Sequence, residues 1–538
     1  MNQIARAVHG PTSPDTIIIG AGLGGLAAAA TLKSRGHSNF LILDRGSSVG
    51  GVWRDNCYPN ASSDTPIELY SFRFFPRSTW SSNFAPWYEI LEYTRDLARE
   101  FELEKNLALD LEVTSAIWND ASATWNVFAS DGRHWTPRFV IWAGGLLSEP
   151  TIPPFAGKSS YRGKIVHTAH WTPDIDLTGQ AVAVVRGGAT SIQILPYAAE
   201  HADRVYAFIR TPSYILPKPE VFYTREDWQR FSSSPELAKG LRAKWFDHFE
   251  ELAATRFPMN EQLIAKQEDA WRNYFDAEVK DPTLRRILRP QYKFGCRRPL
   301  VSNTYYAAVT RPNVTAIGTG IEDLFPGGVI SQDGQQFNVD SVILATGFNA
   351  SGMLGTLDFV GRDGQSLADL WRTCPEAYLG TLVKGFPNLF LINGPNAGSA
   401  SVTDIIESQS RYIASCIELL NDRGRAGLEV REAAHDAYNI DIQNRARQSV
   451  LVLGGCTSWY RAGGGTGSVF SHWPGTIASF QDALAKINVD DLNLFDPQGT
   501  SSKVVRTPQP MDIQGSSPSI EARVMATSTQ QRKSGRQG

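Results

Sequence analysis

The feature that most constrains this chain is a glycine-rich run, Gly20-Ala21-Gly22-Leu23-Gly24-Gly25. The β-branched segment Thr16–Ile19 before it predicts a strand, and the alanine-rich segment after it predicts a helix. In such a G-x-G-x-x-G pattern, Gly20 allows a tight turn, Gly22 lets the backbone approach a pyrophosphate, and Gly25 lets the helix pack closely on the strand. Phosphates would then lie at the helix N-terminus, where free N–H groups and the helix dipole favour anions.

An acidic residue and a second glycine pair specify the ligand further. The predicted strand Phe40–Leu43 ends at Asp44, where a carboxylate can accept hydrogen bonds from ribose hydroxyls. Strand, helix and acid in this order predict a dinucleotide site. Gly51, the second of a glycine pair, and Trp53 follow shortly. We interpret the pair as the place where the chain passes the phosphate arm of a flavin, which favours FAD over NAD.

A second unit of the same kind begins at Ala181–Val185 and continues through Gly187-Gly188 and a helical stretch to a strand at Val205–Ile209. Between Tyr223 and Pro290, apolar residues recur at helical spacing, which predicts a helical insertion that either forms a wall over the active site or packs as a surface module. The predicted fold class is α/β, with two Rossmann-like dinucleotide-binding domains, for FAD and NADPH, and a helical insertion. The expected boundaries are a disordered N-terminus at 1–14, the FAD-binding domain at 15–150 and 376–498, the NADPH-binding domain at 151–215 and 291–375, the insertion at 216–290, and a disordered tail at 499–538.

Charge and composition exclude some partners. The formal net charge is −3 over 538 residues, and such a balance argues against nucleic acid as a partner. Aromatic residues make up 11% of the chain, with 14 Trp, which fits deep apolar pockets, although a large core would explain them equally. The uncharged stretch 16–32 is rich in glycine and predicts strand, turn and helix rather than a membrane span.

The five cysteines are scattered and show no C-x-x-C or Cys/His cluster. We therefore expect neither a disulfide framework nor a metal site, and a reducing compartment is favoured. The first residues, Met1 to Pro14, lack the apolar core of a signal peptide. These observations predict a cytoplasmic protein, and they leave its oligomeric state open.

Two longer patterns point to a family. The first runs from Gly50-Gly51-Val52-Trp53 through Tyr58-Pro59 to Asp64, with Asn60 where Gly or Met is usual. The second runs from Tyr161, in the place of a Phe, through Gly163 and His167 to Trp171. Both resemble the fingerprints of Baeyer–Villiger monooxygenases, and the resemblance covers roughly residues 15–490.

The resemblance implies an activity. In that family FAD accepts hydride from NADPH and reacts with molecular oxygen, and the peroxyflavin converts a ketone to an ester or lactone. We expect a bulky apolar small-molecule substrate, from the many aromatic residues in the insertion and near the C-terminus, and a place in secondary metabolism. Oxygenation of nitrogen or sulfur stays open, because related flavoproteins carry it out and a fold does not determine a reaction.

The resemblance also implies site residues. Arg298 would be the catalytic cation beside the flavin, and Asp64 its ion-pair partner; a plain buried salt bridge is the alternative. Arg297 and the pair Arg210-Thr211 would meet the 2′-phosphate of NADPH.

Three further residues have weaker assignments. His167 and Trp171 would lie near the inter-domain hinge and couple cofactor binding to domain movement, and a core histidine with satisfied hydrogen bonds is the alternative for His167. Trp459, in Ser458-Trp459-Tyr460, would belong to a segment that folds over cofactor and substrate, or it is a core tryptophan. Ala345-Thr346-Gly347 resembles a late element of flavoproteins that bind two dinucleotides.

The second glycine motif departs from the family pattern. Gly188 and Thr190 fit a phosphate-binding turn, but Arg186 stands where the first glycine belongs. Its side chain could crowd the pyrophosphate and strain the backbone by ~1 kcal/mol, or bind the phosphates instead. This leaves two other hypotheses: a member of the fold that keeps FAD but catalyses a rearrangement, cyclisation or oxidation without NADPH, and a non-catalytic flavin-binding protein.

Overall fold

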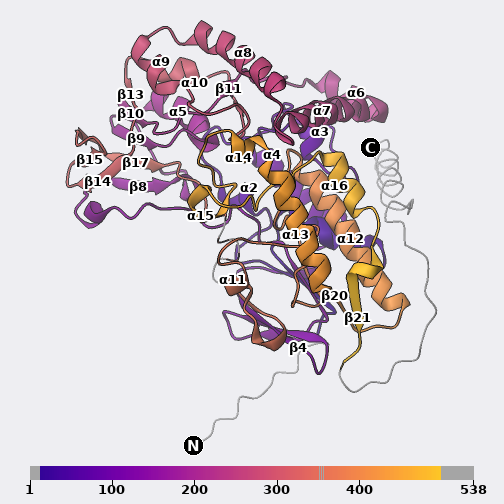
Figure 1. Ribbon diagram of the computed structural model, residues 1–538. Helices are drawn as coiled ribbons and strands as arrows, with labels where there is room; N and C mark the ends of the chain where they lie inside the picture. The colour runs from indigo at the N-terminus through magenta and orange to yellow at the C-terminus, as the bar shows by residue number, and fades with distance from the viewer. Residues whose placement is uncertain (1–12, 351, 353, 355–356, 498–538) are drawn as a thin grey trace, which may run out of the picture.

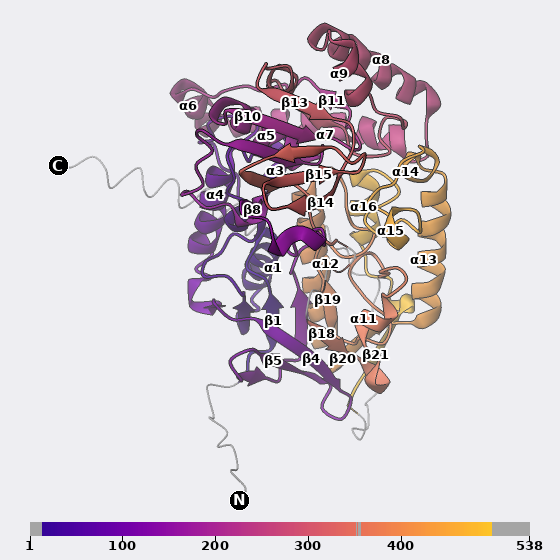
Figure 2. The same ribbon diagram turned by 90° about the vertical axis from the view of Figure 1, so that its left-hand side faces the viewer.

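The computed structural model describes residues 13–350, 352, 354 and 357–497. The predicted tail at 499–538 and most of the N-terminal segment 1–14 lie outside the described residues. Two five-stranded parallel sheets organise the described chain. Figures 1 and 2 show two strands of one sheet, β10 and β13, at the top of the molecule and β4, which lies near the other sheet, at the bottom. The predicted α/β class is confirmed.

The first sheet contains the N-terminal βαβ unit. Its strand order is β19-β7-β1-β2-β3, with bounds β1 Thr16–Ile19, β2 Phe40–Leu43, β3 Leu107–Ala108, β7 Phe139–Trp142 and β19 Leu389–Leu391. Helix α1 (Leu23–Ser34) packs between this sheet and the long helix α12 (Val402–Asp422). The central strands are apolar and buried on both faces, as expected of a parallel sheet covered by helices.

The second sheet repeats the arrangement. Its order is β13-β10-β9-β17-β8, with bounds β8 Lys164–His167, β9 Ala181–Val185, β10 Arg204–Phe208, β13 Val314–Ile317 and β17 Ser341–Leu344. Helices α5 (Ala189–His201) and α10 (Tyr305–Val309) pack together beside it. The second predicted βαβ unit is therefore confirmed, with β10 starting one residue earlier than expected.

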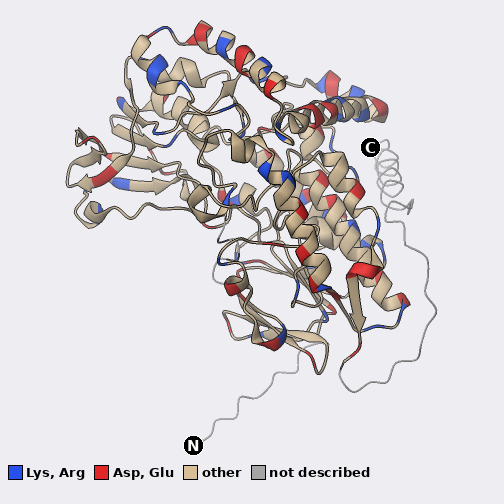
Figure 3. Cartoon of the chain, viewed as in Figure 1, with Lys and Arg blue, Asp and Glu red and all other residues tan. Residues whose placement is uncertain are grey.

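The predicted insertion is helical. It consists of α6 (Arg225–Ser233), α7 (Pro235–Arg256), α8 (Glu261–Glu278) and α9 (Pro282–Leu288). Thr224 and Asp227 form a capping box that starts α6, and positive and negative residues alternate along these helices (Figure 3). Helix α7 packs on α3 (Ile67–Tyr70) and α16 (Ile477–Leu484). No residue of 225–288 lines the large cavity described below. This favours a packed surface module over a wall of the active site.

Smaller elements complete the described chain. The remaining strands are β4 Val113–Asn119, β5 Thr124–Ala129, β6 His134–Trp135, β11 Ile215–Leu216, β12 Leu300–Val301, β14 Ile321–Phe325, β15 Gly328–Ser331, β16 Gln336–Asn338, β18 Asp358–Val360, β20 Gly427–Val430 and β21 Leu492–Phe495. The remaining α-helices are α2 Val52–Asp55, α4 Trp87–Glu100, α11 Leu367–Leu370, α13 Glu432–Arg447, α14 Val450–Leu453 and α15 Ala462–Gly465. Because β18 pairs with β4, the chain has returned by residue 358 to the part of the molecule that contains the first sheet. Among the described helices, none combines the length and apolar character needed to cross a membrane.

The expectation about cysteines is wrong for one pair. Cys296 and Cys456 form a disulfide across 160 residues of sequence, while Cys57, Cys374 and Cys416 are free. No local spacing motif relates these two cysteines, because a pairing over this separation depends on tertiary contacts.

Candidate active site

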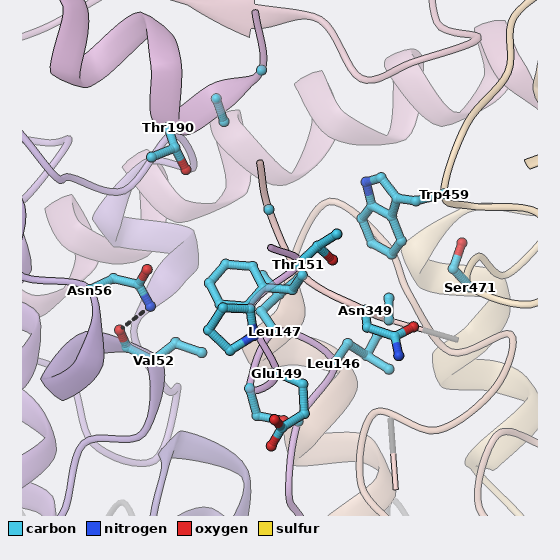
Figure 4. A pocket seen from close by; sticks show the side chains of 18 of the residues that line it. Val52, Asn56, Leu146, Leu147, Glu149, Thr151, Thr190, Asn349, Trp459 and Ser471 are labelled. Carbon is cyan, nitrogen blue, oxygen red and sulfur yellow. Dashed lines mark hydrogen bonds between the residues drawn. The ribbon is translucent and has the colours of Figure 1, made fainter. Parts of the chain in front are cut away.

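One large cavity lies where the carboxyl ends of both parallel sheets meet. Its volume is about 1380 Å³, and its lining includes residues at the ends of β1, β2, β7, β9 and β17. Open α/β sheets bind ligands at these strand ends. In Figure 4, Val52 and Asn56 lie on one side of the pocket, with Thr190 above them, and Trp459, Asn349 and Ser471 lie on the other. Most of the predicted site residues line this cavity: Gly20, Gly22, Asp44, Gly51, Trp53, Asp64, Gly188, Thr190, Arg210, Thr211, Arg297, Arg298 and Trp459.

The first turn, residues 20–25, requires glycine. Gly20 has a φ of +110°, and a Cβ there would lie 2.5 Å from the carbonyl oxygen of Ala143. A Cβ on Gly25 would overlap the carbonyl oxygen of Gly20, so a side chain would push α1 off the strand. A Cβ on Gly22 would lie 3.5 Å from the Cα of Gly51. The backbone therefore forms a narrow cradle at the N-terminus of α1, as predicted.

Asp44 and Trp53 are held in place beside this cradle. The Asp44 carboxylate accepts hydrogen bonds from the backbone N–H groups of Ala21 and Gly46, each at 2.7 Å, and from Arg54 Nη1 at 2.9 Å. These donors orient the carboxylate at the cavity wall; its contact with a ribose stays a prediction. The Trp53 indole N–H donates to the hydroxyl of Tyr70 at 3.1 Å, and the two rings meet edge to face.

The second turn, residues 186–191, contains the departure from the glycine pattern. Arg186 has a φ of +90°, which confirms that this position takes the left-handed backbone conformation that favours glycine. Its Nη1 donates a hydrogen bond to the carbonyl oxygen of Thr346 at 2.7 Å. The side chain thus reaches the Ala345-Thr346-Gly347 element at the end of β17. Gly188 is the N-cap of α5.

Three guanidinium groups lie together at the second turn. Burial and the neighbouring guanidiniums of Arg210 and Arg297 lower the pKa of Arg186. Arg297 donates from Nε and Nη2 to the carbonyl oxygen of Thr457, at 3.0 and 2.6 Å. Within the described part of the chain, none of the three arginines forms an ion pair with a carboxylate. The arrangement is an uncompensated positive region that suits an anionic ligand.

The predicted pairing of Arg298 with Asp64 is confirmed. Arg298 Nη1 lies 2.8 Å from the Asp64 carboxylate, and that carboxylate is the main cause of a raised pKa at Arg298. The Arg298 side chain is 48% exposed and lines the cavity. The ion pair is therefore open to the cavity, which argues against the alternative of a plain buried salt bridge.

His167 and Trp171 lie outside the cavity lining. His167 is buried: its Nδ1 accepts from the backbone N–H of Ala169, so Nε2 carries the hydrogen and donates to the carbonyl oxygen of Gly347, each at 3.1 Å. Both ring nitrogens are thus engaged by backbone, as in the core-histidine alternative. Trp171 is also buried and packs edge to face on Tyr197. Any effect of these two residues on a cofactor would be indirect, and their role at a hinge stays a prediction.

Trp459 lies on the opposite side of the cavity from Val52 and Asn56 (Figure 4). Its side chain is 49% exposed and meets the ring of Tyr460 at 4.6 Å. The alternative of a core tryptophan is thereby excluded.

Sequence reasoning missed Tyr460 and His472. The Tyr460 hydroxyl accepts from the backbone N–H of Arg298 at 3.4 Å, and its ring contacts that of His472 at 4.2 Å. Burial, with Arg256 and Arg298 nearby, holds the pKa of His472 well below its usual value, so the imidazole is neutral. The sequence signal was limited to the nearness of both residues to Trp459. Among the described residues, no group of His, Cys, Asp and Glu side chains could hold a metal ion.

Comparisons with known proteins agree with this geometry. Residues 17–224 match the family model for pyridine nucleotide-disulphide oxidoreductases. A Baeyer-Villiger monooxygenase of Streptomyces coelicolor is 35% identical over 483 residues, which are 89% of this chain and 92% of the relative. An oxidized steroid monooxygenase bound to NADP superposes with a TM-score of 0.79 at 27% identity, covering 90% of this chain and 100% of the other. OTEMO in complex with FAD and NADP gives 0.80 at 25% identity, with the same coverage.

Proposed function

This chain belongs to the Baeyer–Villiger monooxygenases, and we propose that it uses FAD, NADPH and molecular oxygen to convert a bulky apolar ketone to an ester or lactone. The observation that carries the proposal is the Arg298–Asp64 ion pair, 2.8 Å apart, which faces the same cavity as both phosphate turns. The solved relatives that hold NADP, or FAD and NADP, in the same fold support the choice of cofactors.

The first turn fits the pyrophosphate of FAD. Gly20, Gly22 and Gly51 form a cradle that a Cβ would fill or narrow, and the N-terminus of α1 provides free N–H groups. Asp44 at the cavity wall would accept from the ribose. When bound, the flavin would supply hydride acceptance and oxygen activation.

The second turn fits NADPH, whose phosphates carry several negative charges. Arg186, Arg210 and Arg297 bring three positive charges to this turn without carboxylate partners among the described residues. Arginine binds phosphates through charge-assisted, often bidentate hydrogen bonds. Gly188 and Thr190, at the start of α5, would meet the pyrophosphate.

The chain's own residues would contribute electrostatics and exclusion of water. Asp64 keeps the Arg298 guanidinium fixed and protonated at any working pH. A fixed cation of this kind stabilises negative charge that develops on a reacting oxygen. Trp459 covers one side of the cavity and would limit the access of water.

The apolar part of the cavity lining supports an apolar substrate. Leu146, Leu147 and Phe348 line the cavity together with Trp459. The proposal has three further parts: oxygenation at a carbonyl rather than at nitrogen or sulfur, a cytoplasmic location, and a place in secondary metabolism. Product analysis tests the oxygenation at a carbonyl directly.

Replacement of Arg298 tests the proposal. Wild-type protein reconstituted with FAD should consume NADPH in air, faster with a ketone present, and yield an ester or lactone by mass spectrometry. Arg298→Ala should lower product formation at least ~100-fold, the usual effect of removing one electrostatic contact to a transition state, while the flavin content stays unchanged. Full activity in Arg298→Ala would contradict the role assigned to Arg298.

Arg186 favours a second candidate, a member of the family that keeps FAD but works without NADPH. The side chain reaches the Thr346 carbonyl and occupies part of the second turn, where it could exclude a pyrophosphate. An anaerobic titration with NADPH separates the two candidates, because bleaching of the flavin absorbance requires NADPH to bind. No bleaching at millimolar NADPH would reject our proposal in favour of this candidate.

A further inference from the structure

We infer that the Cys296–Cys456 disulfide is a positioning element for the active site, because it fixes the loop that carries Trp459 against the segment that carries Arg298. We call residues 454–467 the cover loop and residues 293–298 the arginine segment. The inference rests on the proposed function for its effect on the reaction, but its structural part can be measured without any activity.

The two segments are joined by several contacts around the disulfide. The backbone N–H of Lys293 donates to the carbonyl oxygen of Gly454 at 2.8 Å. Arg297 donates twice to the carbonyl oxygen of Thr457. A Cβ on Gly454 would lie 2.7 Å from the Cβ of Cys296, so this close approach requires glycine. The disulfide lies within this set of contacts and is its covalent member.

The cover loop needs such a constraint because it is rich in glycine. It contains six glycines: Gly454, Gly455, Gly463, Gly464, Gly465 and Gly467. Glycine loses more conformational freedom on ordering than any other residue, so an unlinked loop of this composition would populate many conformations. A cross-link removes part of that freedom.

The position of the loop affects the site directly. Its Tyr460 hydroxyl accepts from the backbone N–H of Arg298, and its Trp459 side chain faces the cavity. Thr457 holds Arg297, one of the three cations at the second turn. Release of the loop would therefore loosen the support of both arginines and open the cavity to water at the same time.

The two ends of the disulfide differ in burial. Cys296 is fully buried, whereas residue Cys456 is partly exposed, and we expect a small dithiol to attack from the side of Cys456. In the exchange the Cys296–Cys456 bond breaks, the dithiol closes to its own disulfide, and two electrons and two protons pass to the two cysteines. The three described free cysteines have other contacts: Cys57 contacts the backbone of Trp171, Cys374 contacts that of Pro375, and Cys416 is buried.

The first experiment measures the link and the loop. Peptide mass spectrometry after alkylation without reductant should find Cys296 and Cys456 joined in the folded, FAD-loaded protein. Limited trypsin digestion should then report on Arg461, which lies in the cover loop. We expect cleavage there to be at least ~10-fold faster in Cys296→Ser/Cys456→Ser and in wild type treated with a dithiol. Cys374→Ser, which removes a free cysteine outside the cover loop and the arginine segment, is the matched control and should behave as wild type.

The second experiment measures coupling, the ratio of product formed to NADPH consumed. Loss of the link should lower this ratio several-fold and raise peroxide release, with the flavin content unchanged. Dithiol-treated wild type provides the same comparison if the double variant fails to fold. Free Cys296 and Cys456 in the native protein, or equal cleavage and coupling with and without the link, would overturn the inference. If wild type oxygenates no ketone but loop cleavage still depends on the link, the proposed function fails while the positioning of the loop stands.

Discussion

The two phosphate turns share one backbone geometry and differ in the side chains that it tolerates. Gly20 and Arg186 both follow a central parallel strand and have φ of +110° and +90°. Gly22 and Gly188, two residues on, cap α1 and α5 with φ/ψ of −83°/−171° and −91°/−171°. Yet a Cβ is impossible at Gly20 without moving the Ala143 carbonyl, while Arg186 occupies the equivalent place in the second turn.

Two separate restrictions make a glycine obligatory in such a turn. Positive φ alone costs a non-glycine residue about 1 kcal/mol, which a charge-assisted hydrogen bond such as that from Arg186 to Thr346 can offset. A backbone atom within van der Waals distance leaves no such compensation. The first turn has both restrictions, and the second turn has the φ restriction with a side-chain partner in reach.

The largest effect is expected from Gly25→Ala in the first turn. The added Cβ overlaps the Gly20 carbonyl oxygen, so the turn and the α1 N-terminus must separate, and the purified protein should lose nearly all its FAD. The ratio of flavin to protein absorbance measures this. Gly36→Ala is the matched control, since its φ is +88° but no atom lies within 4 Å of the new Cβ; it should lose about 1 kcal/mol of stability and keep its FAD. Normal FAD content in Gly25→Ala would remove the contrast between the turns.

A smaller effect, confined to the second turn, is expected from Arg210→Gln. Loss of one charge-assisted contact to phosphate should weaken NADP⁺ binding roughly 10- to 100-fold, with FAD content unchanged. Isothermal titration at two salt concentrations measures the affinity and its dependence on charge. The exposed Arg311, outside the cavity lining, provides the control variant Arg311→Gln. An unchanged dissociation constant would show that the arginine group does not bind the cofactor.

Arg186→Gly should have a modest effect, because two changes oppose each other. The substitution relieves the backbone strain of a positive φ but removes the bond to Thr346 and adds freedom to the unfolded chain. We expect the unfolding free energy to change by no more than about 1 kcal/mol, and NADP⁺ binding to weaken by up to about 10-fold if Arg186 contacts phosphate. Tighter binding in Arg186→Gly would instead show that the side chain blocks the site. Denaturant unfolding and calorimetric titration give the two quantities.

The smallest effect is expected on the pH dependence of stability, through His167, which donates a hydrogen bond to the carbonyl oxygen of Gly347. Burial lowers the pKa of His167 below its usual value of 6.5, so below that pH the unfolded chain binds more protons than the folded one, and stability is lost as pH falls. Well above pH 6.5 the histidine is neutral in both states, and this contribution no longer changes. The decrease in melting temperature between pH 7.5 and 5.5 should be about 1–2 °C smaller in His167→Gln than in wild type. An identical decrease in both proteins would contradict the lowered pKa of His167.

Local patterns in the sequence were sufficient for the two βαβ units. The strands Phe40–Leu43 and Ala181–Val185 were predicted with their observed bounds, because short apolar runs beside glycine turns and predicted helices leave few alternatives. The pairing of Asp64 with Arg298 was predicted through family resemblance rather than from spacing, and the structure confirms it. His167 and Trp171 were expected near the inter-domain hinge, where they would couple cofactor binding to domain movement. The structure shows their contacts with the protein itself, and the hinge role stays a prediction.

Short stretches of sequence are enough to show where the backbone must turn and approach a phosphate, since the need for glycine at a positive φ or beneath a helix is a property of a few neighbouring residues. Which groups meet across long separations depends on the tertiary structure: Cys296 with Cys456, Arg186 with the Thr346 carbonyl, and His472 with Arg256 and Arg298. These contacts depend on how two sheets and their helices pack, because packing brings together side chains that no local periodicity relates.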